Sequence, residues 1–279
     1  MNTFKYFITA LSLTLIQCQQ GKNENTTSGN PLVAMAVTSS SSNSTVANHY
    51  KPKSLIDLFI PKSFAFPAPS TLLDSSGQSV QLNYNWVNIG QIEFKAQETA
   101  ESEETDGSDI KFEGPYAIDL FSSSPETLGT NTLSLNQVRR IKIKLIRTTS
   151  SVSNAPTGLI GKSIYISGTI NGHSFSFSTT DESEIQVSGP SAISPVNNKA
   201  LLLEIKTADL IRKINLSTIT STTNIDDSNR MSASNPCPSI DSSANDLYTC
   251  FRKGLETEAN LGRDDNGDFR LDAEEESVK

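Results

Sequence analysis

The sequence is poor in the residues on which most enzymatic and metal chemistry depends. Its 279 residues include 2 histidines and 3 cysteines, and it contains no Gly-x-Ser-x-Gly, His-Glu-x-x-His, Cys-x-x-Cys or phosphate-cradling glycine motif. A Ser-His-Asp site would require His49, at the end of a polar segment, or His173, beside a tight turn. We therefore expect a protein without enzymatic activity, with an uncharacterised hydrolase as one alternative.

Positive charge is also scarce. The chain has 23 lysines and arginines against 31 acidic residues, which gives a formal net charge of −8. This balance repels phosphate backbones, so nucleic acid is not an expected partner. Serine, threonine and asparagine are abundant, and they favour strands, turns and loops over helical bundles.

Long hydrophobic runs are missing too. The apolar run Phe7–Ile16 follows Lys5; it is too short to span a bilayer and is typical of a signal peptide. It ends in Leu15-Ile16-Gln17-Cys18, which resembles a bacterial lipobox with Gln17 in place of the usual small residue. We predict that residues 1–17 are a signal peptide and that Cys18 is lipidated. An ordinary cleaved signal with an incidental Cys18, or a signal-anchor helix, are the alternatives.

The expected mature chain begins with a polar segment. Residues 18–48 are low in complexity and include the run Ser39–Thr45. Such a segment buries too little apolar surface to offset its ordering entropy, so we predict a disordered tether. Loss of Lys5 from a total of −8 leaves a mature charge of −9. We expect the protein in the cell envelope, held at the outer membrane by the Cys18 lipid, on the periplasmic face or the cell surface.

Two cysteines remain if Cys18 is acylated, namely Cys237 and Cys250. An even pair in an exported chain predicts a disulfide. It would close a loop of about 14 residues and contribute on the order of 3 kcal/mol by the chain-entropy model. Free thiols are the alternative, and two thiols without nearby histidines are too few for a zinc site.

Residues 49–225 carry the pattern of a β-sandwich domain. Ile141, Ile143 and Leu145 alternate with lysines, as in a strand with one buried face. We predict further strands over 86–94, 116–121, 164–170, 173–177 and 201–205. We also predict an acidic hairpin tip over 97–109 with 110–112 returning the chain, and a short helix or turn over 208–214. The fold class is therefore mainly β, an antiparallel sandwich of about seven or eight strands, with a short C-terminal helical segment.

A hairpin is predicted at Asn171-Gly172, because this dipeptide favours a two-residue turn. Such a turn forms three cross-strand pairs that place apolar bulk on one face, with an aromatic ring covering a glycine. The predicted pairs are Ile170 with His173, Gly168 with Phe175, and Ile166 with Phe177.

These strand motifs resemble a known family. Trp86–Phe94, Gly114–Leu120 and Val138–Ile143 follow one another as in the bacterial lipoprotein domain DUF4382, and Ile170–Phe175 and Leu201–Ile205 fit its usual sequel. The resemblance covers roughly residues 75–220. It implies an exported β-sandwich of unknown function without catalytic residues to carry over. Similar lipoproteins occur in Leptospira-type spirochaetes, where looser lipoboxes are known.

One motif carries metal chemistry. Residues 226–279 are expected to form a C-terminal helix, over Asn245–Asn260, followed by an acidic loop that resembles an EF-hand. Ca²⁺ takes six to eight oxygen ligands, and an EF-hand loop supplies them from positions 1, 3, 5, 7, 9 and 12. Counted from position 1, these ligands are Asp264, Asn266, Asp268, the carbonyl of Arg270, Asp272 and Glu275.

The loop departs from the motif at position 6. Phe269 stands where glycine normally permits a left-handed turn, and Gly267 comes two places earlier. An acidic, solvated tail is therefore the competing interpretation. For the whole protein we expect a non-enzymatic surface or periplasmic module that binds a protein or glycan or has a structural role. A calcium-binding module is the alternative.

Overall fold

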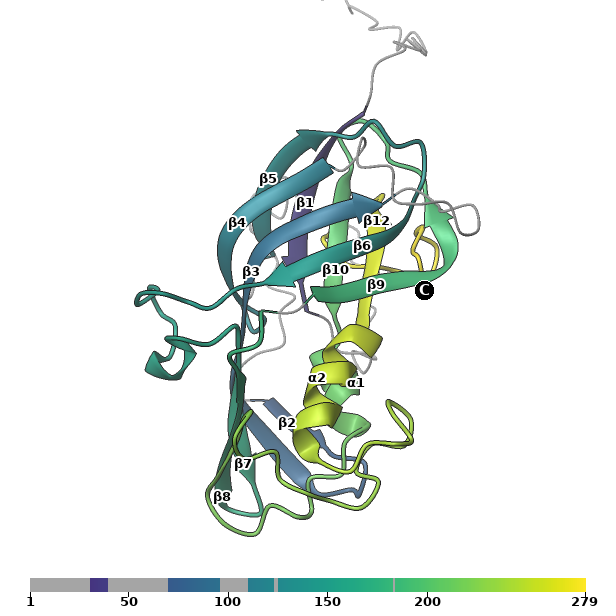
Figure 1. The fold of residues 1–279 in the computed structure, drawn as a ribbon. Coiled ribbons are helices and arrows are strands. Elements are labelled where there is room, and N and C mark those ends of the chain that lie inside the picture. Colours follow the sequence, from purple (N-terminus) through teal and green to yellow (C-terminus); the bar gives the residue numbers. More distant parts are fainter. Residues whose placement is uncertain (1–30, 40–69, 96–109, 123–124, 183) are drawn as a thin grey trace, which may run out of the picture.

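The computed structural model describes residues 31–39, 70–95, 110–122, 125–182 and 184–279, and these parts are mainly β (Figure 1). The strands are β1 Leu32–Thr38, β2 Ser70–Leu73, β3 Ser79–Lys95, β4 Ile110–Asp119, β5 Glu126–Thr132, β6 Val138–Leu145, β7 Ile164–Ile170, β8 His173–Thr179, β9 Glu184–Ile193, β10 Ala200–Ile205, β11 Thr223–Ile225 and β12 Ala259–Asp264. The helices are α1 Thr207–Arg212 and α2 Leu247–Thr257, with a 3-10 turn at Thr157–Leu159. The predicted β-sandwich with a short C-terminal helix is confirmed, although the described strands outnumber the seven or eight expected.

The strands form two sheets. The four-stranded sheet has the order β12-β10-β1-β5, and the larger sheet has the order β11-β8-β7-β3-β6-β9, with β2 and β4 also paired to β3. Strand β3 links two regions, because its first half pairs with β2 and β7 and its second half with β4 and β6. The second region faces the four-stranded sheet, whereas α1 and α2 lie beside β2, β7 and β8 (Figure 1). Most pairs are antiparallel, but β1–β10 and β8–β11 are parallel, which the sequence analysis did not predict.

Strand β1 contradicts part of the predicted disordered tether. Residues 32–38 lie inside the segment expected to be disordered, yet they form a strand between β10 and β5. Val33, Met35 and Val37 are each at most 1% exposed and belong to the core. The prediction failed because the apolar stretch Leu32–Val37 is short and stands between polar runs. Its partners come from distant parts of the chain.

Several predicted features lie outside the described residues. They are the signal peptide, Cys18, His49 and the acidic tip over 97–109. The strands that flank the tip do pair, with Phe94 of β3 opposite Ile110 of β4.

The Asn171-Gly172 hairpin is confirmed in its register. β7 and β8 pair Ile170 with His173, Gly168 with Phe175 and Ile166 with Phe177. Both turn residues have the positive φ that this turn requires, 51° at Asn171 and 78° at Gly172. A Cβ on Gly168 would lie 3.1 Å from Cε1 of Phe175, so the aromatic ring does lie against the glycine.

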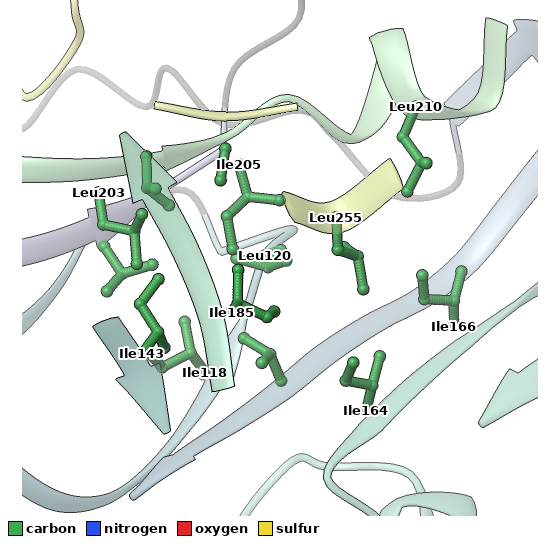
Figure 2. Close-up of a cluster of buried hydrophobic side chains, with 14 of the residues drawn as sticks. Ile118, Leu120, Ile143, Ile164, Ile166, Ile185, Leu203, Ile205, Leu210 and Leu255 are labelled. Carbon is green, nitrogen blue, oxygen red and sulfur yellow. The ribbon is translucent and has the colours of Figure 1, made fainter. Parts of the chain in front are cut away.

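Helix α2 packs against this hairpin. Its first turn is capped by Asp246, whose side chain accepts a hydrogen bond from the Thr249 N–H at 2.6 Å. Phe251 then stacks on Phe177 of β8 with ring centroids 4.8 Å apart. Figure 2 shows Leu255 of α2 in the same buried cluster as Ile185 of β9. The core therefore continues across the boundary that the sequence analysis placed at residue 225.

Candidate metal centre

The acidic loop Asp264–Glu275 joins β12 to the last residues of the chain. The predicted entering helix over Asn245–Asn260 is wrong only at its end, because α2 ends at Thr257 and β12 precedes the loop. The apolar spacing of the helix does continue to Ala259, but Ala259 pairs with Ile205 of β10 instead. After the loop, Ser277 forms a bridge with Gly262. The loop thus lies between two extended segments and not between two helices.

The side chain of Asp264 organises the start of the loop. It is 2% exposed, and its carboxylate accepts hydrogen bonds from the N–H groups of Gly267 at 2.6 Å and Phe269 at 3.1 Å. Both of these residues have a positive φ, 81° at Gly267 and 60° at Phe269. Position 6 of the motif therefore adopts the left-handed backbone that glycine usually supplies, with the strain expected of a bulky residue.

The next two candidate ligands form successive turns of the same kind. The Oδ1 atom of Asn266 accepts from the Asp268 N–H at 2.8 Å, and Oδ1 of Asp268 accepts from the Arg270 N–H at 3.0 Å. The Asn266 amide donates to Oδ2 of Asp272 at 3.2 Å, which connects positions 3 and 9. The side chains of Asn266, Asp268 and Asp272 thus point toward the interior of the loop.

Glu275 folds back over the beginning of the loop. Its Oε1 atom accepts from the N–H groups of Asp265 at 2.8 Å and Asn266 at 3.2 Å, and its Oε2 atom accepts from Asp272 N–H at 3.1 Å. Glu275, at position 12, therefore contacts the backbone at positions 2, 3 and 9. Its side chain connects the end of the loop to its beginning.

The apolar position 8 anchors the loop to the sheet. A Cβ on Gly262 would lie 2.4 Å from Cδ2 of Leu271, so this glycine leaves the space that the leucine fills. The loop is therefore attached to β12 at its first residue, Asp264, and again at Leu271.

Negative charge is concentrated inside the loop. Burial raises the pKa of Asp268, and the N–H of Arg270 lowers it. The carboxylates of Asp272, Asp264 and Glu275 raise this pKa further. Asp265, at position 2, has the opposite environment, because hydrogen bonds from the Arg263 guanidinium lower its pKa, against a smaller effect of burial. Asp265 thus belongs to an ion pair, with N–O distances of 2.6 and 2.9 Å, and not to the predicted ligand set.

The donor set fits Ca²⁺ in its chemistry, because the side chains at positions 1, 3, 5, 9 and 12 offer only oxygen ligands. Within the described ranges, however, no three side chains of His, Cys, Asp or Glu are gathered as a metal cluster. The carboxylates are bound instead to backbone N–H groups of the loop. A cation would have to draw them from these positions toward a common centre.

The residues that surround the loop carry no recognisable signal in the sequence. Arg263 donates to the Ser194 carbonyl at 2.5 Å and to Glu276 at 2.9 Å, and Lys199 donates to the Asp265 carbonyl at 2.5 Å. These contacts join segments that are up to 69 residues apart. No local pattern in the sequence could have indicated them.

The other predicted site residues in the described parts of the chain lie outside the acidic loop. Cys237 and Cys250 form the predicted disulfide, with their Cα atoms 5.8 Å apart. His173 begins β8 at the hairpin turn, opposite Ile170. Neither helix of the described parts is long and apolar enough to cross a membrane.

Comparison with known proteins gives no match to a family model, a curated protein or a solved structure. The resemblance to the DUF4382 lipoproteins stays a prediction from the strand motifs.

Proposed function

We propose that this protein is a non-enzymatic module of the cell envelope, lipid-anchored at Cys18, whose loop Asp264–Glu275 binds Ca²⁺. The observation that carries the calcium proposal is the position of Glu275. Its carboxylate folds back over positions 2, 3 and 9, as the closing ligand of an EF-hand-like loop must do.

The cation would have a structural role. The loop holds four acidic candidate ligands whose mutual repulsion costs free energy, and a divalent cation would remove that cost. It would also fasten the end of β12 to the segment that follows the loop. A single loop without a paired partner suggests the weak affinity of extracellular calcium modules, about 10⁻⁴ to 10⁻³ M.

A calorimetric titration of the lipid-free protein (residues 19–279, which include every described residue) with CaCl₂ tests this proposal. We expect a single binding event and a higher melting temperature in the wild type, and neither in Asp264→Ala or Asp268→Ala. Glu274→Ala is the matched control, because it removes an exposed acid of the same loop that is not at a ligand position. If the wild type shows neither heat nor a change in melting temperature, the calcium proposal is wrong.

The disulfide supports export, because disulfides persist in oxidising compartments. The anchor has its own test. In a diderm bacterial host the wild type should incorporate labelled palmitate and partition into detergent, whereas Cys18→Ser should do neither. Equal labelling of the two proteins would refute the anchor.

The role in the envelope follows from this architecture. A tethered β-sandwich presents loops to the solvent, where a protein or glycan can bind. Surface plasmon resonance with host-matrix and envelope glycans would test this part. Binding that survives substitution of every exposed sandwich loop would contradict it.

A further inference from the structure

The first half of β3 and the strands β2, β7, β8 and β11 form a part of the larger sheet with two different faces. On one face Phe177 stacks on Phe251 of α2, and Val80 and Ile166 are buried in the same core. Helix α2 therefore covers this face. Side chains alternate along a strand, so the residues next to these point to the opposite, outward face.

The outward face is continuous from strand to strand. Directly opposed residues of neighbouring strands point to the same face. One row of such residues consists of Tyr84, Ser167, Ser176 and Asn224. The neighbouring row consists of Thr71, Gln81, Thr169 and Ser174. Hydroxyl and amide groups thus extend across all five strands.

This outward face carries no charged side chain. Aspartate, glutamate, lysine and arginine are all absent from the segments Ser70–Leu73, Ser79–Tyr84, Ile164–Ile170, His173–Thr179 and Thr223–Ile225. The second half of β3 is different, because Glu93 lies opposite Lys142 of β6, and Lys144 of β6 lies opposite Glu184 of β9. One strand therefore passes from an uncharged face, formed by the outward residues of these five segments, to a charged one.

Charged groups flank the uncharged face at its margins. Asp119 of β4 lies opposite Trp86, two residues after Tyr84. Asp227 follows β11, and its carboxylate accepts hydrogen bonds from Tyr248 and Thr180. Asp74 follows β2, but it is 5% exposed. A ligand that needs a salt bridge would meet its partner at these margins and not on the face itself.

Two tyrosines give the uncharged face its largest contact surfaces. The rings of Tyr84 and Tyr165 are 6.5 Å apart and tilted by 48°. Tyr165 is half-buried because Gly158 lies against it, and a Cβ at Gly158 would be 2.4 Å from Cε2 of its ring. Tyr84 is 44% exposed. Such a ring can pack against a ligand at little cost in conformational entropy.

The size of the uncharged face argues against a stable protein partner. Five strands about 4.8 Å apart, each with about six residues of about 3.3 Å, give roughly 24 by 20 Å, or about 500 Å². A standard protein–protein interface buries about 800 Å² on each partner and has an apolar centre. The uncharged face has neither this area nor such a centre.

We propose that the uncharged face binds an uncharged polysaccharide, with a sugar ring against Tyr84 and sugar hydroxyls bonded to the serine, threonine, asparagine and glutamine side chains. Hydroxyl and amide groups both donate and accept hydrogen bonds, as sugar hydroxyls do. The C–H groups of a sugar ring match the negative face of an aromatic ring. The inference rests on the proposed role as a binding module, but it places this ligand on strands and not on the loops.

The test is affinity electrophoresis of the lipid-free protein in native gels that contain EGTA, so that the result does not depend on calcium. The gels contain dextran, mannan or hydroxyethyl cellulose, which are uncharged, or hyaluronan, which is anionic. Migration relative to a protein that binds none of them gives the dissociation constant. We expect at least one uncharged polysaccharide to slow the protein. Hyaluronan should not, since a protein of net charge −8 repels an anion.

Two variants locate the site. Tyr84→Ala removes the exposed ring, and Gln81→Glu places a charge on the uncharged face that a bound sugar would desolvate. Each should raise the dissociation constant about tenfold. Gln186→Glu is the matched control, because it makes the same substitution at an exposed glutamine of β9, on the charged part of the sheet, and it should bind like the wild type. Far-ultraviolet circular dichroism shows whether each variant is folded.

Four results would overturn the proposal. The first two are the absence of binding to every uncharged polysaccharide and equal binding of hyaluronan. The third is unchanged affinity in folded Tyr84→Ala and Gln81→Glu; if substitution of the sandwich loops abolishes binding instead, the loop site of the proposed function remains and the uncharged face is excluded. The fourth is self-association in sedimentation velocity that Tyr84→Ala abolishes, which would assign the face to a second copy of the chain.

Discussion

The backbone N–H of Val278 donates to the carbonyl oxygen of Leu261 over 2.9 Å, so the last residues of the chain pair with β12. The carbonyl of Val278 accepts from Ser191 of β9 at 3.3 Å. Since β12 and β9 are edge strands of the two different sheets, Val278 connects the sheets through its backbone. Its side chain is 0% exposed and lies in the core.

Val278→Ala should therefore destabilise the protein, although it is the penultimate residue. Loss of a buried valine side chain predicts a decrease of about 2 kcal/mol in the free energy of unfolding, measured by urea denaturation. The control is Val196→Ala, the same substitution at a valine that is 41% exposed. Equal effects of the two substitutions would mean that the tail does not hold the sheets together.

Asp268→Asn should have opposite effects with and without calcium. The folded protein raises the pKa of Asp268, so the ionised carboxylate costs stability in the metal-free state. We expect the variant to melt about 1–2 °C higher than the wild type in EGTA, as for a partly solvent-screened charge, and to gain nothing from CaCl₂. A calcium-dependent increase in the melting temperature of the variant would exclude Asp268 as a ligand.

Removal of the disulfide should cost on the order of 3 kcal/mol in the free energy of unfolding, for a closed loop of about 14 residues. The double variant Cys237→Ser, Cys250→Ser tests this by urea denaturation. Cys237 and Cys250 are both 0% exposed, and each single serine variant already loses the whole cross-link, so the single variants should lose nearly as much stability as the double variant. Free thiols at Cys237 and Cys250 in the unreduced lipid-free protein, which lacks Cys18, would contradict the disulfide itself.

Tyr248 should titrate well above the ordinary pKa of a tyrosine side chain. Burial and the hydrogen bond to the Asp227 carboxylate raise its pKa from 10.0 to about 12, against a hydrogen bond with Thr179. The folded state thus holds the phenolic proton more tightly than the unfolded state does. This contribution to stability is complete below pH 10 and is lost as the pH rises through 12. Ultraviolet titration should show a late phenolate step that Tyr248→Phe removes.

The pKa of Asp227 is shifted in the opposite direction, below its ordinary value. Burial alone would raise its pKa, but hydrogen bonds from Tyr248 and Thr180 hold it below the ordinary value. This contribution to stability is present at neutral pH and is lost as the pH falls through the lowered pKa. Tyr248→Phe should therefore also cost about 1–2 kcal/mol at pH 7, the usual effect of leaving a charged acceptor with fewer donors. A variant as stable as the wild type would show that the pair is held by packing alone.

The parts of the fold that the sequence predicted are those with local signals. The register of β7 and β8 follows from one dipeptide, Asn171-Gly172, and the buried face of β6 follows from alternation of isoleucine with lysine. Helix α2 has both an apolar stripe and the cap Asp246. In each case the signal itself lies within a few residues, although the strands that pair with β6 and the ring that stacks on Phe251 of α2 come from distant parts of the chain.

The parts that were missed depend on distant partners. β1 carries a short apolar stretch whose neighbours in the sheet are more than 80 residues away. The apolar spacing of α2 continues to Ala259, but pairing with β10 stabilises a strand over residues 259–264. For the candidate site, spacing predicted which oxygens would share one loop. It did not predict the contacts of Arg263, which directly precedes the loop, or of Lys199, which lies just before β10.

The place of β1 also determines how the molecule resists mechanical load. Because this strand lies between β5 and β10, tension applied at the N-terminus acts along two rows of hydrogen bonds at once. These bonds are perpendicular to the strand in the antiparallel pair and slanted in the parallel pair, so the load shears them together and does not open them one by one. Detachment would expose Val33, Met35 and Val37 to water, so tension on β1 acts directly on the hydrophobic core.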